Sequence, residues 1–167
     1  MKAMPLKEYN RQDALAYADR WALNRNPNYY DFSKLGGDCT NFCSQVLRAG
    51  GCSMNYNRTY GWYYRNGNDK TPSWGGVNFF HNFLTRDKDI GPVAEEVSVK
   101  DIEPGDIIQL SFVEENSYNH SLIVVDCGNP LDISNISIST HTIDRYHYLL
   151  TNYNWTKIRF LHIIGYK

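Results

Sequence analysis

The sequence lacks the features that mark several specialised classes of protein. No apolar run approaches the roughly 20 residues that a membrane-spanning helix needs. Basic and acidic residues nearly balance, 17 against 18, and no basic block indicates nucleic-acid binding. There is no internal repeat and no low-complexity tract. The 167 residues, 42% of them hydrophobic, predict one domain with one sizeable core.

Cysteine is scarce, and the first residues do not resemble a secretion signal. Four cysteines allow three disulfide pairings, but a chain of this length does not need disulfides to fold. Structural zinc is disfavoured, because Cys39 and Cys43 have a suitable spacing but no second close pair of ligands follows. Residues 1–7 have no apolar core, so we expect either a cytosolic protein or a piece of a longer secreted one.

Two helices are predicted within the first 50 residues. Asn10 can cap the first, and apolar residues then recur at helical spacing as far as Ala22. A Gly-Gly-Asp loop precedes the second, which has an apolar stripe and ends at Gly50. Cys39 is therefore expected in the first turn of a short, buried helix.

From residue 97 onward the pattern changes from helix to strand. Segments rich in β-branched residues alternate with turn residues. The predicted strands cover residues 97–99, 107–112, 120–126, 136–142 and 160–166. Helices followed by strands predict an α+β fold, with N-terminal helices packed on an antiparallel β-sheet.

Residues 54–72 are rich in aromatic side chains and predict a long loop, followed by a helix that begins at Thr71 or Ser73. Long loops in small domains are often functional, and aromatic rings can stack on sugars or line a peptide groove. The candidate substrate-binding rim consists of Tyr56, Tyr60, Trp62, Tyr63 and Tyr64. Alternatively, the tryptophans of this region simply anchor the loop.

Cys39 is the best candidate for a nucleophile. A thiol reacts as the thiolate, and a helix N-terminus both lowers the thiol pKa and offers free N–H groups to an oxyanion. We expect Asp38 to cap the helix and Thr40 to support the site from the same turn. Buried cysteines are more often core residues, an interpretation that suits Cys43 on the apolar stripe.

A cysteine nucleophile needs a histidine base from elsewhere in the chain. His120 is the strongest of five candidates, because it follows a polar loop and opens an apolar strand that would hold it at a cleft. His81 falls on a helical stripe, and His147 and His162 have no comparable context.

A third residue should orient the base. His141, in the strand expected beside His120, is the first choice, and Asp144 is the second. The alternation of side chains along the two strands does not favour a direct contact between His120 and His141. His120 shares its face of the strand with apolar residues, whereas His141 shares its face with serines.

Residues 37–45 resemble the DCTNF-x-SQ signature of the putative amidase domain family. Similar segments recur in register at residues 9–18, 26–30, 62–64, 73–74, 104–106, 120–121 and 140–144. The resemblance covers residues 9–167 as one domain and leaves residues 1–8 as an N-terminal extension. The family is similar to the wider group of CHAP and NlpC/P60-like cysteine peptidases.

This resemblance implies a papain-like core with Cys39 as nucleophile and His120 as base. It supports His141 less firmly, because relatives in the wider group use different residues there. It implies an amide hydrolase that needs no metal or organic cofactor, and a peptide or peptidoglycan-like substrate outside the cell or at a bacterial cell wall. The absent secretion signal is the main departure from this pattern.

Two other functions remain open on the sequence. The same cleft could serve a non-catalytic module that binds cell-wall glycopeptides or a partner protein. Cys39 and Cys43 could instead act together in redox or acyl-transfer chemistry, although an i, i+4 pair on one helix lies near the upper distance limit for a disulfide.

Overall fold

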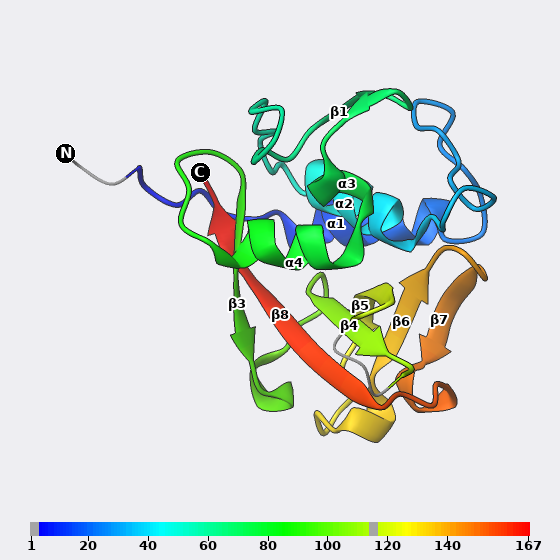
Figure 1. Ribbon diagram of the computed structural model, residues 1–167. Coiled ribbons are helices and arrows are strands. Elements are labelled where there is room, and N and C mark those ends of the chain that lie inside the picture. Colours follow the sequence, from blue (N-terminus) through cyan, green and yellow to red (C-terminus); the bar gives the residue numbers. More distant parts are fainter. Residues whose placement is uncertain (1–3, 114–116) are drawn as a thin grey trace.

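A layer of helices covers one face of a curled antiparallel sheet in the computed structural model, which describes residues 4–113 and 117–167 (Figure 1). The helices are α1 (Arg11–Trp21), α2 (Cys39–Ala49), α3 (Pro72–Gly75) and α4 (Val77–Thr85). The large sheet has the order β3-β8-β4-β5-β6-β7. Its strands are β3 (Pro92–Val97), β4 (Ile107–Ser111), β5 (His120–Asp126), β6 (Ser137–Thr140), β7 (Arg145–Leu149) and β8 (Lys157–Tyr166). The predicted α+β class is confirmed.

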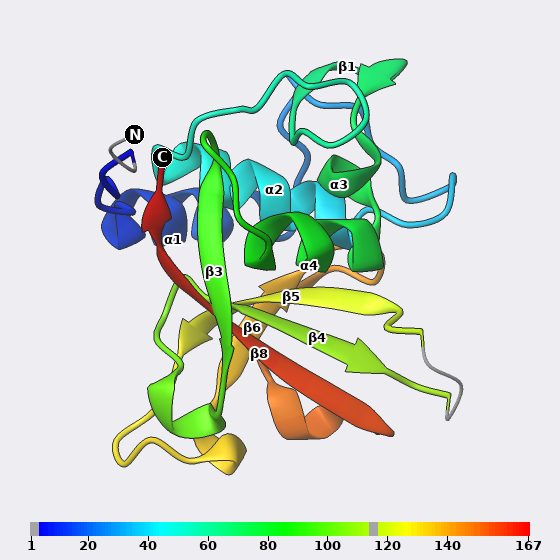
Figure 2. The same ribbon diagram turned by 60° about the vertical axis from the view of Figure 1, so that its left-hand side comes forward.

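Smaller elements complete the chain. A hairpin pairs β1 (Tyr64–Asn66) with β2 (Asp69–Lys70) above the helical layer (Figure 2). The short 3₁₀ helices of the described residues are η1 (Val99–Asp101), η2 (Ile133–Asn135) and η3 (Leu150–Asn152). No helix in the described residues is long and apolar enough to cross a membrane.

The two predicted N-terminal helices form where their local signals place them. Asn10 caps α1, and its side-chain oxygen accepts a hydrogen bond of 3.0 Å from the Asp13 backbone. Cys39 is the first residue of α2, as predicted. The first nine residues of α2 are all buried, because α1, α3 and β5 pack around it. The nucleophile candidate therefore lies at the end of the most enclosed helix.

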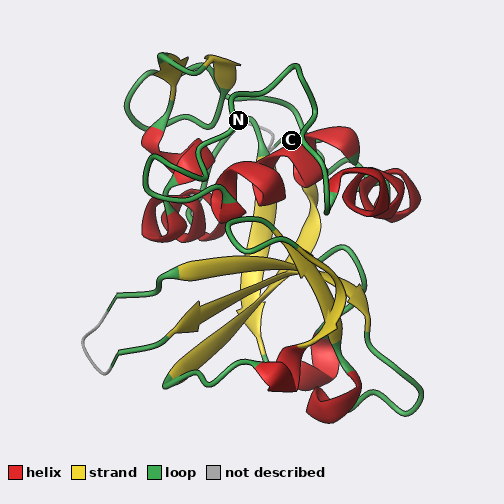
Figure 3. Cartoon of the chain, turned by 90° about the vertical axis from the view of Figure 1, so that its right-hand side faces the viewer, coloured by secondary structure: helices red, strands yellow, loops and turns green. Residues whose placement is uncertain are grey.

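Both faces of the central strands are buried, which explains their nearly continuous apolar sequences. On the helical side, Ile107 pairs with Ile123 and Leu161. On the opposite side, Ile108 pairs with Leu122 and Phe160. The curl of the sheet and the short helices η2 and η3 enclose this second core (Figure 3). The strand that begins with His120 is thus held from both sides.

Several predicted boundaries were wrong. Residues 54–72 are not a free loop, because the β1–β2 hairpin lies within them. The predicted helix after Thr71 is interrupted at Gly76, which is extended. The strand expected at residues 97–99 instead covers residues 92–97. β6 ends early because Thr142 adopts a positive φ of 81°, and β7 was not predicted.

Candidate active site

The first turn of α2 packs against the start of β5, where His120 lies. The Cys39 sulfur is 3.8 Å from the Thr40 hydroxyl oxygen, and the Ser121 backbone also hydrogen-bonds to it. The hydroxyl oxygens of Thr40 and Ser121 are 2.9 Å apart, and Gln109 donates to the latter at 3.2 Å. These buried contacts place Cys39 directly beside the residue that follows His120.

Burial sets the protonation of both candidates. It raises the pKa of the Cys39 thiol, although hydrogen bonds from Ser121 and Thr40 oppose the rise. Burial also lowers the pKa of His120 to about 4. The expectation of a lowered thiol pKa was therefore wrong for this arrangement, because desolvation outweighs the hydrogen bonds that Ser121 and Thr40 make to the sulfur. At neutral pH the pair is a neutral thiol and a neutral imidazole.

Aromatic rings frame His120. Its ring centroid is 5.7 Å from that of Tyr153 and 6.3 Å from that of Phe112. Neither ring nitrogen has a hydrogen-bond partner within residues 4–113 and 117–167. Burial raises the pKa of Tyr153 to about 12; nearby Arg145 opposes this rise and Cys39 adds to it. Tyr153 therefore lies close to both members of the candidate pair.

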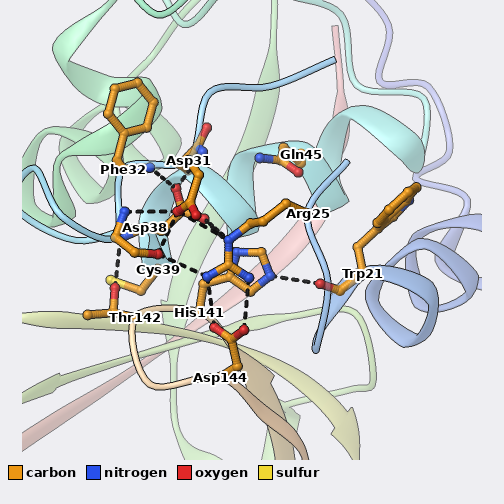
Figure 4. Close-up of polar contacts among 12 residues, drawn as sticks. Trp21, Arg25, Asp31, Phe32, Asp38, Cys39, Gln45, His141, Thr142 and Asp144 are labelled. Carbon is orange, nitrogen blue, oxygen red and sulfur yellow. Dashed lines mark hydrogen bonds and ion pairs between the residues drawn. The ribbon is translucent and has the colours of Figure 1, made fainter. Parts of the chain in front are cut away.

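Asp38 anchors the nucleophile loop without capping the helix. It occupies the N-cap position of α2 but makes no side-chain capping hydrogen bond, contrary to expectation. One carboxylate oxygen instead accepts hydrogen bonds of 2.8 Å from the Phe32 backbone and from the Asn41 side chain. The other accepts one of 2.6 Å from His141 (Figure 4). The carboxylate therefore joins the loop before α2 and the first turn of α2 to the distant His141.

His141 does not orient His120, which corrects the first choice for the third residue. Its Nδ1 bonds to Asp38, and its Nε2 lies 2.7 Å from the backbone oxygen of Trp21. Its ring stacks on Phe42 with centroids 4.1 Å apart. Both ring nitrogens face oxygen acceptors, so the side chain is fully engaged beneath the N-terminus of α2 (Figure 4).

Asp144, the second choice, also lies away from the base. It forms two hydrogen bonds of 2.9 Å with Arg25, whose Nε is 3.2 Å from Asp31 and 3.5 Å from Asp38 (Figure 4). Arg25 gave no signal in the sequence, because Asp144, with which it forms both hydrogen bonds, is 119 residues away. The ion pairs join the loop before Cys39 to the turn between β6 and β7.

Comparison with known sequences assigns the chain to a family. The profile of the putative amidase domain family matches residues 8–164. The chain belongs to this family. The chain is 35% identical over 126 residues to uncharacterized protein YhbB of Bacillus subtilis (strain 168), covering 73% of this chain and 39% of YhbB. It is 24% identical over 150 residues to uncharacterized protein YjcM of the same organism, covering 86% and 33%.

The chain thus spans only about a third of the length of these curated relatives. No solved structure matches the chain.

Three members of the expected aromatic rim belong to the core of the amidase domain. Trp62 is fully buried, and its indole N–H donates to the Ser44 hydroxyl at 3.0 Å. Tyr63 and Tyr64 are 2% and 8% exposed, and Tyr64 packs against Trp74. Because these three side chains are buried, they cannot form a surface that binds substrate.

Tyr56 and Tyr60 are exposed but line a different hollow. They border a pocket together with Arg86 and neighbouring residues of the loop that follows α4. None of the residues lining this pocket contacts Cys39 or Ser121 among the contacts of the described residues. The rim predicted around the nucleophile is therefore not assembled there.

A carboxylate–histidine group on the far side of the domain has the composition of a metal site. The ligand atoms of Glu103, Asp106 and His162 lie within 4.8 Å of one another. Asp106 already accepts hydrogen bonds from Arg11, from His162 and from two backbone N–H groups. The arrangement is a satisfied structural network.

Proposed function

We propose that the domain is a cysteine-dependent amide hydrolase with Cys39 as nucleophile and His120 as base. The observation that carries the proposal is the contact between the first turn of α2 and the start of β5. There the Ser121 backbone hydrogen-bonds to the Cys39 sulfur, and Tyr153 lies near both Cys39 and the His120 ring. Membership of the amidase family supports the same reaction class.

The proposed reaction begins from the neutral pair. His120 accepts the thiol proton while the Cys39 sulfur attacks the amide carbonyl carbon. The N–H groups of the first turn of α2 lack intrahelical partners and can stabilise the oxyanion. The His120 imidazolium then protonates the leaving amine. Finally, His120 takes a proton from water, the resulting hydroxide attacks the thioester, and the acid product leaves as the Cys39 thiol is regenerated.

The finer assignments rest on resemblance. A helix-borne cysteine packed on an antiparallel sheet that carries a histidine is similar to the papain-like core of CHAP and NlpC/P60 proteins. On that basis we propose cell-wall peptides as the substrate class, acted on outside the cell or at the wall.

Trapping of the acyl-enzyme tests the proposal. The wild type, Cys39→Ser, His120→Ala and the control Cys127→Ser are exposed to p-nitrophenyl acetate and examined by intact-mass measurement. Cys127 is buried like Cys39, at 7% exposure each, but lies on the opposite face of the sheet. We expect an acetyl adduct in the wild type and the control, none in Cys39→Ser and a much slower one in His120→Ala. Equal acylation of Cys39→Ser would contradict the proposal.

A binding module on the same fold is the second candidate. Its support is that His120 has no hydrogen-bonded orienting residue among those described and that burial raises the Cys39 pKa. This function predicts that a digest of cell-wall peptides binds equally well to the wild type and Cys39→Ser, with no acyl adduct and no new product by mass spectrometry. Cleavage that depends on Cys39 would exclude it.

A further inference from the structure

A groove of about 340 Å³ lies beside the loop that carries the nucleophile. Its walls include the apolar side chains of Phe32, Leu35, Pro72 and Phe79. Leu35 and Phe79 are 65% and 61% exposed, so large apolar surfaces face solvent at its mouth. Two exposed apolar side chains at the mouth of one groove are typical of a surface that binds an apolar ligand.

The groove lies next to the loop that leads to the candidate nucleophile. Gly37, which lines it, is two residues before Cys39. Gly76 lines its other side and immediately precedes Val77, whose carbonyl accepts a hydrogen bond from Gln109. The same Gln109 amide contacts Ser121 beside the sulfur. The groove therefore extends from the loop before Cys39 to the start of α4.

Lys70 gives the groove its charge. It is the charged side chain among the described residues that line the groove, and its Nζ lies 4.7 Å from the centroid of the Phe32 ring. No ion pair within residues 4–113 and 117–167 neutralises it. A lysine that packs on an aromatic ring and forms no ion pair among the described residues is complementary to a ligand that combines an apolar group with a carboxylate.

The direction of the substrate follows from the chemistry. The leaving amine must face His120 to receive its proton, and His120 lies on the sheet among Phe112 and Tyr153. The groove belongs to the helical layer, and its lining residues do not include these rings. The acyl side of the substrate is therefore the part that extends into the groove.

We infer that this groove binds the acyl-side portion of a peptide substrate, with a large apolar side chain between Phe32 and Phe79 and an acidic neighbouring residue beside Lys70. The inference rests on the proposed role of Cys39 as nucleophile, and it derives the substrate class from the lining of the groove in place of the family resemblance.

Peptidyl chloromethyl ketones test the inference. The Cys39 sulfur forms a thioether with their methylene carbon, chloride leaves, and the thiol proton passes to solvent through His120. We compare reagents with the peptide parts acetyl-Glu-Leu, acetyl-Glu-Ala and acetyl-Lys-Leu, and use iodoacetamide as a reagent without a peptide. For the wild type we expect acetyl-Glu-Leu to label Cys39 at least tenfold faster than acetyl-Glu-Ala and several-fold faster than acetyl-Lys-Leu.

Two variants change the groove itself. A Cβ at Gly75 would meet only the end of the Lys70 side chain, at 3.9 Å, so Gly75→Leu fills the groove while leaving its walls in place. It should remove the preference for Leu over Ala. Lys70→Glu should reverse the preference for Glu over Lys, whereas Lys100→Glu, the same charge change at a remote exposed residue, should preserve it. Gly75→Ala is the milder second variant if the leucine lowers stability.

The outcomes separate the two claims. If iodoacetamide labels Cys39 of the wild type but the peptide reagents show no preference, the groove is not the binding site and the nucleophile assignment stands. If the preferences exist but persist in both groove variants, the groove assignment is again overturned. If no reagent modifies Cys39, the proposed nucleophile fails and the inference fails with it.

Discussion

Removal of the buried Asp38 carboxylate should destabilise the protein strongly. Asp38 and His141 are 0% and 1% exposed, and Asp38 also accepts from the Phe32 backbone and the Asn41 side chain. Asp38→Ala leaves these buried donors without their acceptor. Breaking a buried pair in this way costs about 3–5 kcal/mol of unfolding free energy. For a domain of this size, that corresponds to a fall in melting temperature of roughly 6–20 °C.

The assay is urea unfolding of the wild type, Asp38→Ala, Asp38→Asn and a control at neutral pH. Asn at position 38 can still accept from the backbone, and its amide N–H can donate to the His141 ring, so it should recover most of the loss. The control is Asp19→Ala, which breaks an exposed Asp–His pair of 2.7 Å and should cost at most about 1 kcal/mol. If Asp38→Ala loses less than about 1 kcal/mol, the carboxylate does not organise the loop and the reasoning is refuted.

Further predictions concern the base, the core and the first helix. Since burial lowers the pKa of His120 from 6.5 to about 4, protonation favours the unfolded chain below pH 6.5, and stability should fall by up to about 3 kcal/mol between pH 6.5 and 4. Urea titrations of His120→Phe should lack this component. Trp62→Ala should lower the free energy of unfolding by about 3–5 kcal/mol, and Tyr60→Ala should lower it by less than about 0.5 kcal/mol. If Trp62 instead belonged to a substrate-binding rim, its replacement would weaken substrate binding and leave the free energy of unfolding nearly unchanged. Asn10→Ala should cost about 1 kcal/mol in thermal unfolding through loss of its cap, and an unchanged melting temperature would contradict this.

Local signals in the sequence predicted the parts of the fold that local interactions determine. The Asn10 cap, the Gly-Gly-Asp loop before Cys39 and the β-branched run after His120 each lie next to the element that they specify. The rest of the prediction came from the resemblance to the family, because the family's motifs relate segments that are far apart in the sequence and that no repeating apolar pattern connects.

Long-range contacts were the part that local signals did not predict. Asp38 was expected to cap its own helix, but it bonds to His141, 103 residues away. The residue after His141, Thr142, has a left-handed backbone, a conformation that a glycine would have signalled in the sequence but a threonine does not. Likewise, a helix N-terminus indicates a lowered thiol pKa, but only the packing around Cys39 shows that desolvation is the larger effect.

The two ends of the described chain meet. Lys7 and Tyr166 exchange backbone hydrogen bonds of 2.7 and 3.1 Å, which adds a bridge from the N-terminal segment to the last strand (Figure 1). A module whose entrance and exit are adjacent can be joined to further sequence at either end, or inserted within a longer chain, without stretching the body that holds its reactive groups. Joined in this way, the domain would keep its groove and its thiol in one folded unit. The linker would then set how that unit is oriented relative to the sequence it is joined to.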